Sequence, residues 1–90
     1  MTTQAVPEPR PTDLDGIVLE AFARSLSLGD VAADASFFDL GGTSLTAALL
    51  LTELEERLKI EIPISTLLDN PTSAALSRRL RMQLASAAAI

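Results

Sequence analysis

The chain has 90 residues, a formal net charge of −5, and neither histidine nor cysteine. This length fits one small domain, and the missing residue types exclude disulfides and most transition-metal sites, so we expect no metal. Twelve acidic residues against seven basic ones argue against nucleic acid as a partner, because phosphate binding needs clustered lysine and arginine.

The distribution of apolar residues argues against export and membrane insertion. The N-terminus lacks the apolar segment of a signal peptide. The longest uninterrupted apolar run covers residues 47–51, which is far short of a membrane span. We therefore expect a cytoplasmic protein with no membrane partner.

The first predicted elements are a tail and a helix. Residues 1–11 contain three prolines at alternate positions, which forbid a helix and predict a flexible N-terminal tail. Residues 13–27 are predicted to form a helix, with Thr12 as N-cap and Asp15 in an approximate capping box. Its apolar residues recur at helical spacing: Leu14, Ile17, Val18, Ala21, Phe22 and Leu26.

Residues 30–43 lose this periodicity and predict a long loop. Loops of this length inside small domains are either functional or disordered. This one contains four large apolar residues, Val31, Phe37, Phe38 and Leu40, which is too many for disorder. We expect an ordered loop that places one or both phenylalanine rings in the core.

A second helix is predicted from residue 44 to about residue 59, with Ser44 as its N-cap. Its core-facing stripe consists of Ala47, Leu50, Leu54 and Leu58, with Leu51 at the edge. Leu45 and Leu49 fall on the outer side of the helix, where burial in the core would not place them.

The remainder of the chain predicts a connector, one short turn and a last helix. Ile60, Ile62 and Ile64 alternate with polar residues and Pro63, which favours an extended connector that buries its isoleucines rather than a strand. Ser65 is expected to cap a single turn over residues 66–69. Asn70-Pro71 then stops the chain.

Thr72 is expected to cap the last helix, whose apolar stripe consists of Ala75, Leu76, Leu80 and Leu84. Its arginines, Arg78, Arg79 and Arg81, are expected near its C-terminal end, where they complement the helix dipole. Residues 85–90 are predicted to be a C-terminal tail. Three helices and one short turn in residues 12–84 predict an all-α domain, a small antiparallel bundle.

The motif Asp39-Leu40-Gly41-Gly42-Thr43-Ser44-Leu45 places a serine at the start of a helix. With no histidine or cysteine as base or partner, Ser44 is poorly suited to act as a nucleophile, and we expect no catalytic residue in this chain. It is well suited to be modified by another enzyme, because two glycines leave the hydroxyl accessible. The helix N-terminus also favours an attached anion. The competing interpretation is that Ser44 is only a cap and the glycines only a turn.

The segment from Asp34 through Ile64 resembles a thiolation domain, the acyl or peptidyl carrier protein of modular biosynthesis. In that family the serine of this motif receives a 4′-phosphopantetheine arm, which maps the modified residue onto Ser44. Ile62-Pro63-Ile64 and Asn70-Pro71-Thr72 also match the family pattern, and the resemblance covers about residues 12–82. It implies a four-helix bundle with three main helices, a short third helix that crosses the others, and a long loop between helices one and two.

The resemblance also implies a function. Such a carrier is not an enzyme. It holds an aminoacyl or acyl group as a thioester and delivers it to partner enzymes in nonribosomal peptide or hybrid natural-product biosynthesis. The expected partners are a phosphopantetheinyl transferase, an adenylating or loading enzyme, and a downstream condensing or tailoring enzyme, acting on a monomer.

The two glycines before Thr43-Ser44 resemble the peptidyl branch, and the short tails suggest a free-standing carrier. Thr43 departs from the histidine or aspartate usual at its position. The alternatives are an acyl carrier protein for polyketide or fatty-acid-type synthesis and an unmodified helical interaction domain.

Leu45 and Leu49, exposed one turn apart beside Ser44, predict a partner-docking surface. Thr46, Thr66 and Leu67 are expected to complete it. The alternative is that Leu45 packs under the loop and that Leu49 is incidental, since exposed leucines are common. Four acidic residues either steer partners or form an ordinary solvated face: Asp39, Glu53, Glu55 and Glu56.

Overall fold

A computed structural model describes residues 14–88, with side chains to residue 86. It contains α1 (Leu14–Leu26), α2 (Ser44–Leu58), α3 (Ile64–Asp69) and α4 (Ser73–Ala88). The all-α class, with three long helices and one short one, is confirmed. Thr12 and the predicted N-terminal tail lie outside the described residues, as do residues 89–90.

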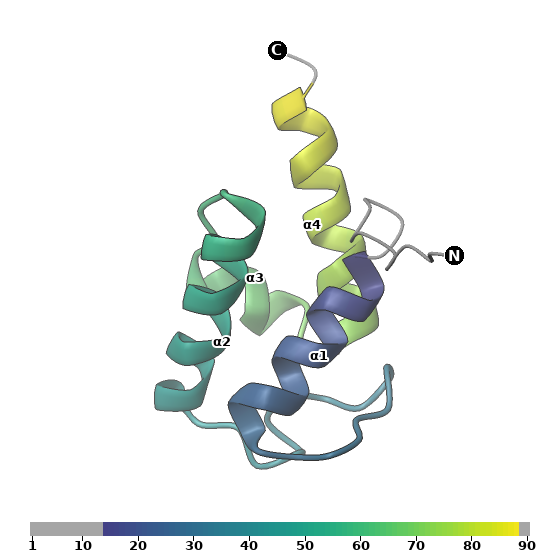
Figure 1. The fold of residues 1–90 in the computed structure, drawn as a ribbon, viewed down its shortest axis with the longest axis vertical. Coiled ribbons are helices and arrows are strands. Elements are labelled where there is room, and N and C mark those ends of the chain that lie inside the picture. Colours follow the sequence, from purple (N-terminus) through teal and green to yellow (C-terminus); the bar gives the residue numbers. More distant parts are fainter. Residues whose placement is uncertain (1–13, 89–90) are drawn as a thin grey trace, which may run out of the picture.

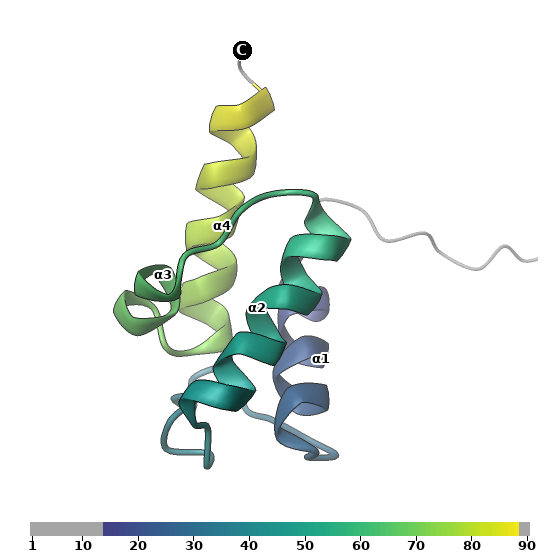
Figure 2. The same ribbon diagram turned by 90° about the vertical axis from the view of Figure 1, so that its left-hand side faces the viewer.

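Helix α1 runs antiparallel to both α2 and α4, whereas α2 and α4 point the same way (Figures 1 and 2). The prediction of an antiparallel bundle is therefore correct only for the pairs that include α1. The reason is that residues 59–72, including α3, carry the chain back across the bundle before α4 begins.

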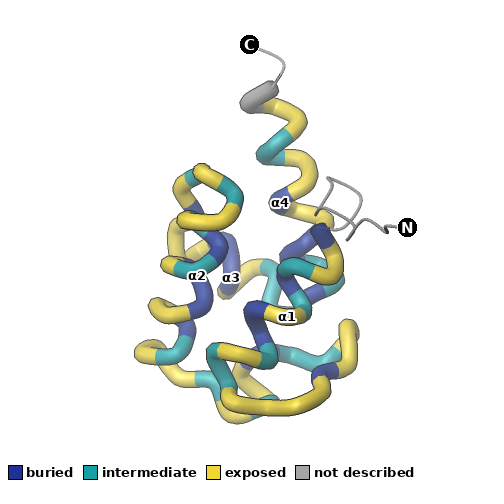
Figure 3. Tube along the Cα trace, viewed as in Figure 1, coloured by how far each residue is buried: buried dark blue, intermediate teal, exposed yellow. Residues whose placement is uncertain are grey.

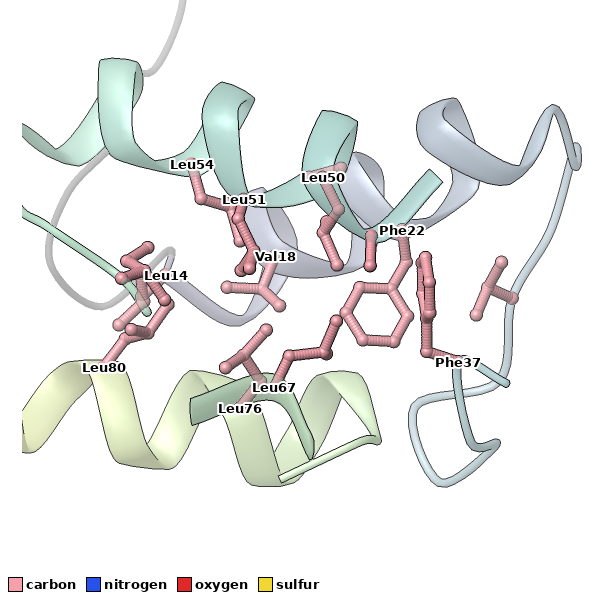
Figure 4. Close-up of a cluster of buried hydrophobic side chains, with 14 residues drawn as sticks. Leu14, Val18, Phe22, Phe37, Leu50, Leu51, Leu54, Leu67, Leu76 and Leu80 are labelled. Atoms are coloured by element: carbon pink, nitrogen blue, oxygen red, sulfur yellow. The ribbon is translucent and has the colours of Figure 1, made fainter. Parts of the chain in front are cut away.

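The core lies between α1, α2 and α4, and α3 closes one side of it (Figure 4). The buried faces of the helices follow the predicted stripes, so the exposed positions lie on the outside of the bundle (Figure 3). The buried hydrophobic residues are Leu14, Val18, Ala21, Phe22, Val31, Phe37, Ala47, Leu50, Leu51, Leu54, Ile62, Leu67, Leu76 and Leu80.

The loop of residues 27–43 crosses the end of the bundle (Figure 1). Phe37 anchors this loop. The Phe37 ring is fully buried and packs edge to face on Phe22, with 5.3 Å between ring centroids. Its backbone N–H donates to the Pro71 carbonyl at 2.7 Å. The loop is therefore ordered, as predicted. Only one of its two phenylalanine rings is buried in the core, because Phe38 is 37% exposed.

Several predicted boundaries differ in the structure. Ile64 was expected to be buried in the connector, but it begins α3 and is 47% exposed. Ser65 lies inside this helix, whose N-cap is Pro63 without a side-chain hydrogen bond. Thr72 does cap α4, since its Oγ1 accepts from the Ala75 N–H at 3.1 Å.

Helix α4 continues through residues predicted to form a tail. It runs to Ala88, so its arginines lie in the middle of the helix rather than in its last turn. Arg81 instead donates to the Asp15 carboxylate of α1 at 3.1 Å. The arginines therefore do not complement the dipole at the end of α4, as was expected, and Arg81 instead links α4 to α1.

Asp15 joins the start of α1 to the middle of α4. Besides Arg81, it accepts a hydrogen bond from the hydroxyl of Ser77, which is fully buried. The Ser77 hydrogen bond, followed by that of Arg81, lowers the pKa of Asp15 below its ordinary value of 3.8. This contact satisfies a buried hydroxyl that would otherwise cost free energy.

The Asp15 contact should make the stability of the domain sensitive to acid. Because the folded-state pKa is depressed, the stabilisation is fully present above pH 3.8 and is lost as the pH falls through the folded value. We expect the difference in free energy of unfolding between wild type and Asp15→Asn to be constant from neutral pH to about pH 5 and to shrink below pH 3.8. Urea unfolding followed by circular dichroism measures this difference. Ser77→Ala should weaken the pH dependence, and a difference that stays constant down to strongly acidic pH would contradict the assignment.

Candidate functional site

The Gly41-Gly42 turn precedes α2, and each glycine is required for a different reason. Gly41 has a φ of +103°, a conformation that strains any other residue. At Gly42 a Cβ atom would collide with the Phe37 ring and lie 2.7 Å from the Phe37 carbonyl oxygen. The Gly42 N–H also donates to that carbonyl at 3.0 Å. The turn is therefore packed directly on the buried phenylalanine.

Thr43, and not Ser44, is the N-cap of α2. Its backbone is extended, its Oγ1 accepts from the Thr46 N–H at 3.2 Å, and its own N–H donates to Thr46 Oγ1 at 2.8 Å. This is a reciprocal capping box. The prediction that Ser44 caps the helix is wrong, because Ser44 is already the first helical residue. The cap thus leaves the exposed Ser44 hydroxyl unused.

Ser44 lies at the loop end of α2, beside exposed apolar side chains. Leu45 is 72% exposed and Leu49 is 55% exposed, which places both on the outer face, as predicted. Helix α3 packs against α2 (Figure 2). It carries two more exposed apolar residues, Ile64 at 47% and Leu68 at 57% exposed. We call these four residues the apolar face.

Two of the predicted docking residues are not accessible. Leu67 is fully buried and lies in the core (Figure 4), and Thr66 is 8% exposed. Both residues therefore have little exposed surface to offer a partner, and Ile64 and Leu68 hold the exposed positions of α3 instead. Thr46 is half-buried and occupied in the capping box.

Two of the four acidic side chains considered for steering are engaged within the domain. Glu53 pairs with Arg24 of α1 at 3.0 Å and with Arg57 at 3.6 Å. The Glu55 carboxylate accepts from the Ile62 N–H at 2.8 Å. Glu56 and Asp39 are exposed. The long-range charge available near Ser44 is therefore smaller than the sequence suggests.

Two further features are absent from the part of the chain that the structure describes. In residues 14–88, no group of three or more aspartate or glutamate side chains is placed to hold a metal ion. Within the same part of the chain, no helix combines the length and apolar character needed to cross a membrane.

Two roles are not evident in the sequence: that of Thr43 as N-cap and that of Phe37 as the support of Gly42. The pair Thr43 and Thr46 has the spacing of a capping box, but with threonine where glutamate or glutamine is usual, so its signal is weak. The spacing from Phe37 to Gly42 carries no comparable signal, because it depends on how the loop folds back.

A four-helix bundle that presents a serine behind a Gly-Gly turn defines a carrier domain. Residues 16–80 match the family described as "Phosphopantetheine attachment site", and the chain belongs to this family. It is a non-catalytic carrier protein of the kind found in nonribosomal peptide synthetases, and the cofactor of the family is 4′-phosphopantetheine.

Comparison with individual proteins agrees with this assignment. The chain is 41% identical over 71 residues to a dimodular nonribosomal peptide synthase of Bacillus subtilis (strain 168), covering 79% of this chain and 3% of that protein. It thus spans a few per cent of the length of such relatives.

Solved structures share the fold. BlmI, a type-II acyl carrier protein of Streptomyces verticillus involved in bleomycin biosynthesis, superposes with a TM-score of 0.79 at 27% identity, covering 83% of this chain and 90% of that one. A peptidyl carrier protein solved in complex with the transferase Sfp and coenzyme A superposes with a TM-score of 0.73 over 88% of this chain and 99% of that chain. Its 22% identity makes it evidence for the fold alone.

The capping role of Thr43 can be tested by Thr43→Val, which keeps the shape of the side chain but removes the hydroxyl. We expect a loss of about 1 kcal/mol in the free energy of unfolding, as for other N-cap substitutions. Chemical denaturation measures this loss. Thr52→Val, at an exposed position within the same helix, is the matched control and should change stability far less. Equal effects of the two substitutions would show that the cap is not stabilising.

Proposed function

We propose that Ser44 is the attachment point of the 4′-phosphopantetheine arm, and that the chain delivers an aminoacyl or acyl group held on that arm as a thioester. The observation that carries the proposal is the position of Ser44. It is exposed, it is the first residue of α2, and the cap that precedes it belongs to Thr43. The hydroxyl is therefore available to a modifying enzyme.

The surroundings of Ser44 suit a phosphodiester. The first N–H groups of α2 and the positive end of its dipole favour a negative charge, and no acidic residue lies in the first turn of this helix. Gly41 and Gly42 place no side chain over the approach to the hydroxyl. When bound, the arm supplies the thiol that forms the thioester, whereas this chain supplies only the anchor.

The base needed to activate the Ser44 hydroxyl must come from the modifying enzyme. The chain contains no histidine, and the hydroxyl of a serine is a weak nucleophile without an adjacent base. The choice of cargo then belongs to the partner enzymes.

Several partners follow from this function. The chain belongs to the family described as "Phosphopantetheine attachment site", which supports a phosphopantetheinyl transferase as the first partner. We propose an adenylating or loading enzyme as the second and a condensing or tailoring enzyme as the third. Because the arm comes from coenzyme A, we propose that the carrier acts in the cytoplasm, and we propose that it acts as a monomer.

The relatives favour a peptidyl carrier over an acyl carrier for polyketide-type synthesis. The 41% identical relative is a nonribosomal peptide synthase, whereas BlmI, which is described as an acyl carrier protein, is only 27% identical. Loading by an adenylating enzyme with a panel of amino and carboxylic acids would separate these cargo classes.

We further propose that the apolar face, Leu45, Leu49, Ile64 and Leu68, docks the partners. These side chains are between 47% and 72% exposed, and they lie on the helix that begins with Ser44 and on the helix packed against it. Since Glu53 and Glu55 are engaged elsewhere, we expect docking to depend on apolar contact more than on charge.

Attachment at Ser44 is tested by incubating the protein with coenzyme A and a promiscuous phosphopantetheinyl transferase and measuring its intact mass. We expect a gain of one phosphopantetheine group in the wild type and none in Ser44→Ala. Ser65→Ala, at an exposed serine of α3, is the matched control and should be modified like the wild type. No gain with several transferases would indicate an unmodified interaction domain.

The apolar face is tested by Leu49→Glu. We expect the fold to be retained, because Leu49 is 55% exposed. The KM of the carrier as substrate of its transferase or loading enzyme should rise by about tenfold, which corresponds to the loss of about 1.4 kcal/mol of binding. Met82→Glu on α4 is the matched control, since Met82 is 60% exposed and lies on another helix. Circular dichroism that shows unfolding of Leu49→Glu, or equal effects of both substitutions on KM, would contradict the proposal.

A further inference from the structure

The first turn of α2 carries Ser44 but contributes nothing to the core. Ser44 and Leu45 are exposed and Thr46 is half-buried, and the first buried side chain of the helix is Ala47. Helix ends fray when their side chains are not packed, and their first N–H groups lack partners within the helix. The position of Ser44 must therefore be fixed by the residues that precede it.

Those residues form a short chain of contacts that ends on Phe37. Ser44 follows Thr43, whose capping box with Thr46 closes the turn. Thr43 follows Gly42, whose N–H donates to the Phe37 carbonyl at 3.0 Å and which has no room for a Cβ atom beside the Phe37 ring. The turn rests on both the side chain and the backbone of Phe37.

Phe37 is itself held by two other parts of the bundle. Its ring packs edge to face on Phe22 of α1 and is fully buried (Figure 4). Its N–H donates to the Pro71 carbonyl just before α4 at 2.7 Å, and its neighbour Ser36 bridges Thr72. Phe37 thus joins the body of the domain to the turn that precedes Ser44.

From these contacts we infer that Phe37 is a positioning residue for the modification of Ser44. Its ring and its carbonyl hold Gly42, and through Thr43 they fix the direction in which the Ser44 hydroxyl meets the transferase. This inference rests on the proposed attachment of the arm at Ser44. Phe37 supplies the three atoms nearest to a Cβ placed at Gly42, which gives it a direct role in the turn besides its role in the core.

The inference predicts a specific kinetic effect for Phe37→Leu. The smaller side chain no longer fills the space beside Gly42, so the first turn of α2 frays while the apolar face is retained. A small misplacement of a reacting group can lower a rate by up to about a hundredfold. For the transferase with coenzyme A, we expect kcat to fall by about tenfold and the KM for the carrier to change by less than about twofold.

Amide hydrogen exchange gives a second readout that does not depend on the transferase. The N–H groups of Thr46 and Ala47 donate to Thr43 in the folded turn. We expect both to exchange faster in Phe37→Leu, while the Leu54 amide in the middle of α2 keeps its protection. A general loss of stability would accelerate all three amides.

Two further variants keep the test decisive. Ile62→Val removes one methylene from the same core at the other end of α2, where Ile62 is 3% exposed, and should leave kcat and the first-turn amides unchanged. Gly42→Ala forces the turn away from Phe37 without opening a cavity, and it should reproduce the loss of kcat if Phe37→Leu fails to fold. All rates are compared at a temperature where circular dichroism shows each variant folded.

Each outcome decides between the possibilities. Normal exchange of Thr46 and Ala47 in Phe37→Leu would show that Phe37 does not hold the turn, and faster exchange with unchanged kcat would show that the turn does not matter for modification. Either result overturns the inference. If the wild type takes up no arm, the proposed function fails, and the exchange experiment still tests whether Phe37 orders the turn.

Discussion

The packing of Phe37 at the open end of the bundle is the contact on which the rest of the structure depends. Three long helices supply apolar stripes, but the loop of residues 27–43 must cross the end of the core. Ordering a loop of this length costs conformational entropy at every residue. Burial of the Phe37 ring against Phe22 offsets part of this cost, since aromatic pairs contribute about 0.5–1.5 kcal/mol beyond the area that they bury. The same contact determines where the chain enters α2, and thereby where Ser44 lies.

Several charged side chains of α1 and α2 are paired with one another within the domain. Glu20 and Glu53 pair with Arg24 and Arg57 across α1 and α2, in a network of four ion pairs. Exposed pairs of this kind contribute little to stability, but they occupy side chains that would otherwise project their charge toward a partner. Glu55 is likewise occupied by the connector. Of the four acidic residues considered for steering, only the exposed Asp39 and Glu56 are thus left to act on a partner.

Apolar periodicity predicted the buried faces of the long helices. It did not predict features that depend on one or two residues, such as a helix cap or the buried face of a short helix. The stripes of α1, α2 and α4 were predicted correctly, because each repeats over several turns. Helix α3 was not, because six residues do not define a face, and nothing local indicates that Leu67 turns inward while Leu68 turns outward. The start of α2 was misplaced by one residue because Thr43 and Ser44 both carry hydroxyls, and only the backbone conformation decides which one caps. The role of Ser77 was not predicted, because a serine on a helix gives no sign that an aspartate far away in sequence will accept a hydrogen bond from its hydroxyl.

The site must satisfy two requirements that oppose each other. A serine that receives a group from another enzyme has to be exposed, yet exposed helix ends are the least ordered parts of a bundle. Packing side chains around Ser44 would order it but would also cover it. Here three features order the turn and leave the hydroxyl uncovered. Thr43 and Thr46 form the capping box, Gly41 adopts a positive φ, and Gly42 packs against the Phe37 ring. The exposed Ser44 is thus held in place by the backbone that precedes it and by the core beneath that backbone. This explains why the two adjacent glycines are needed for different reasons, Gly41 for its φ and Gly42 for its close contact with Phe37.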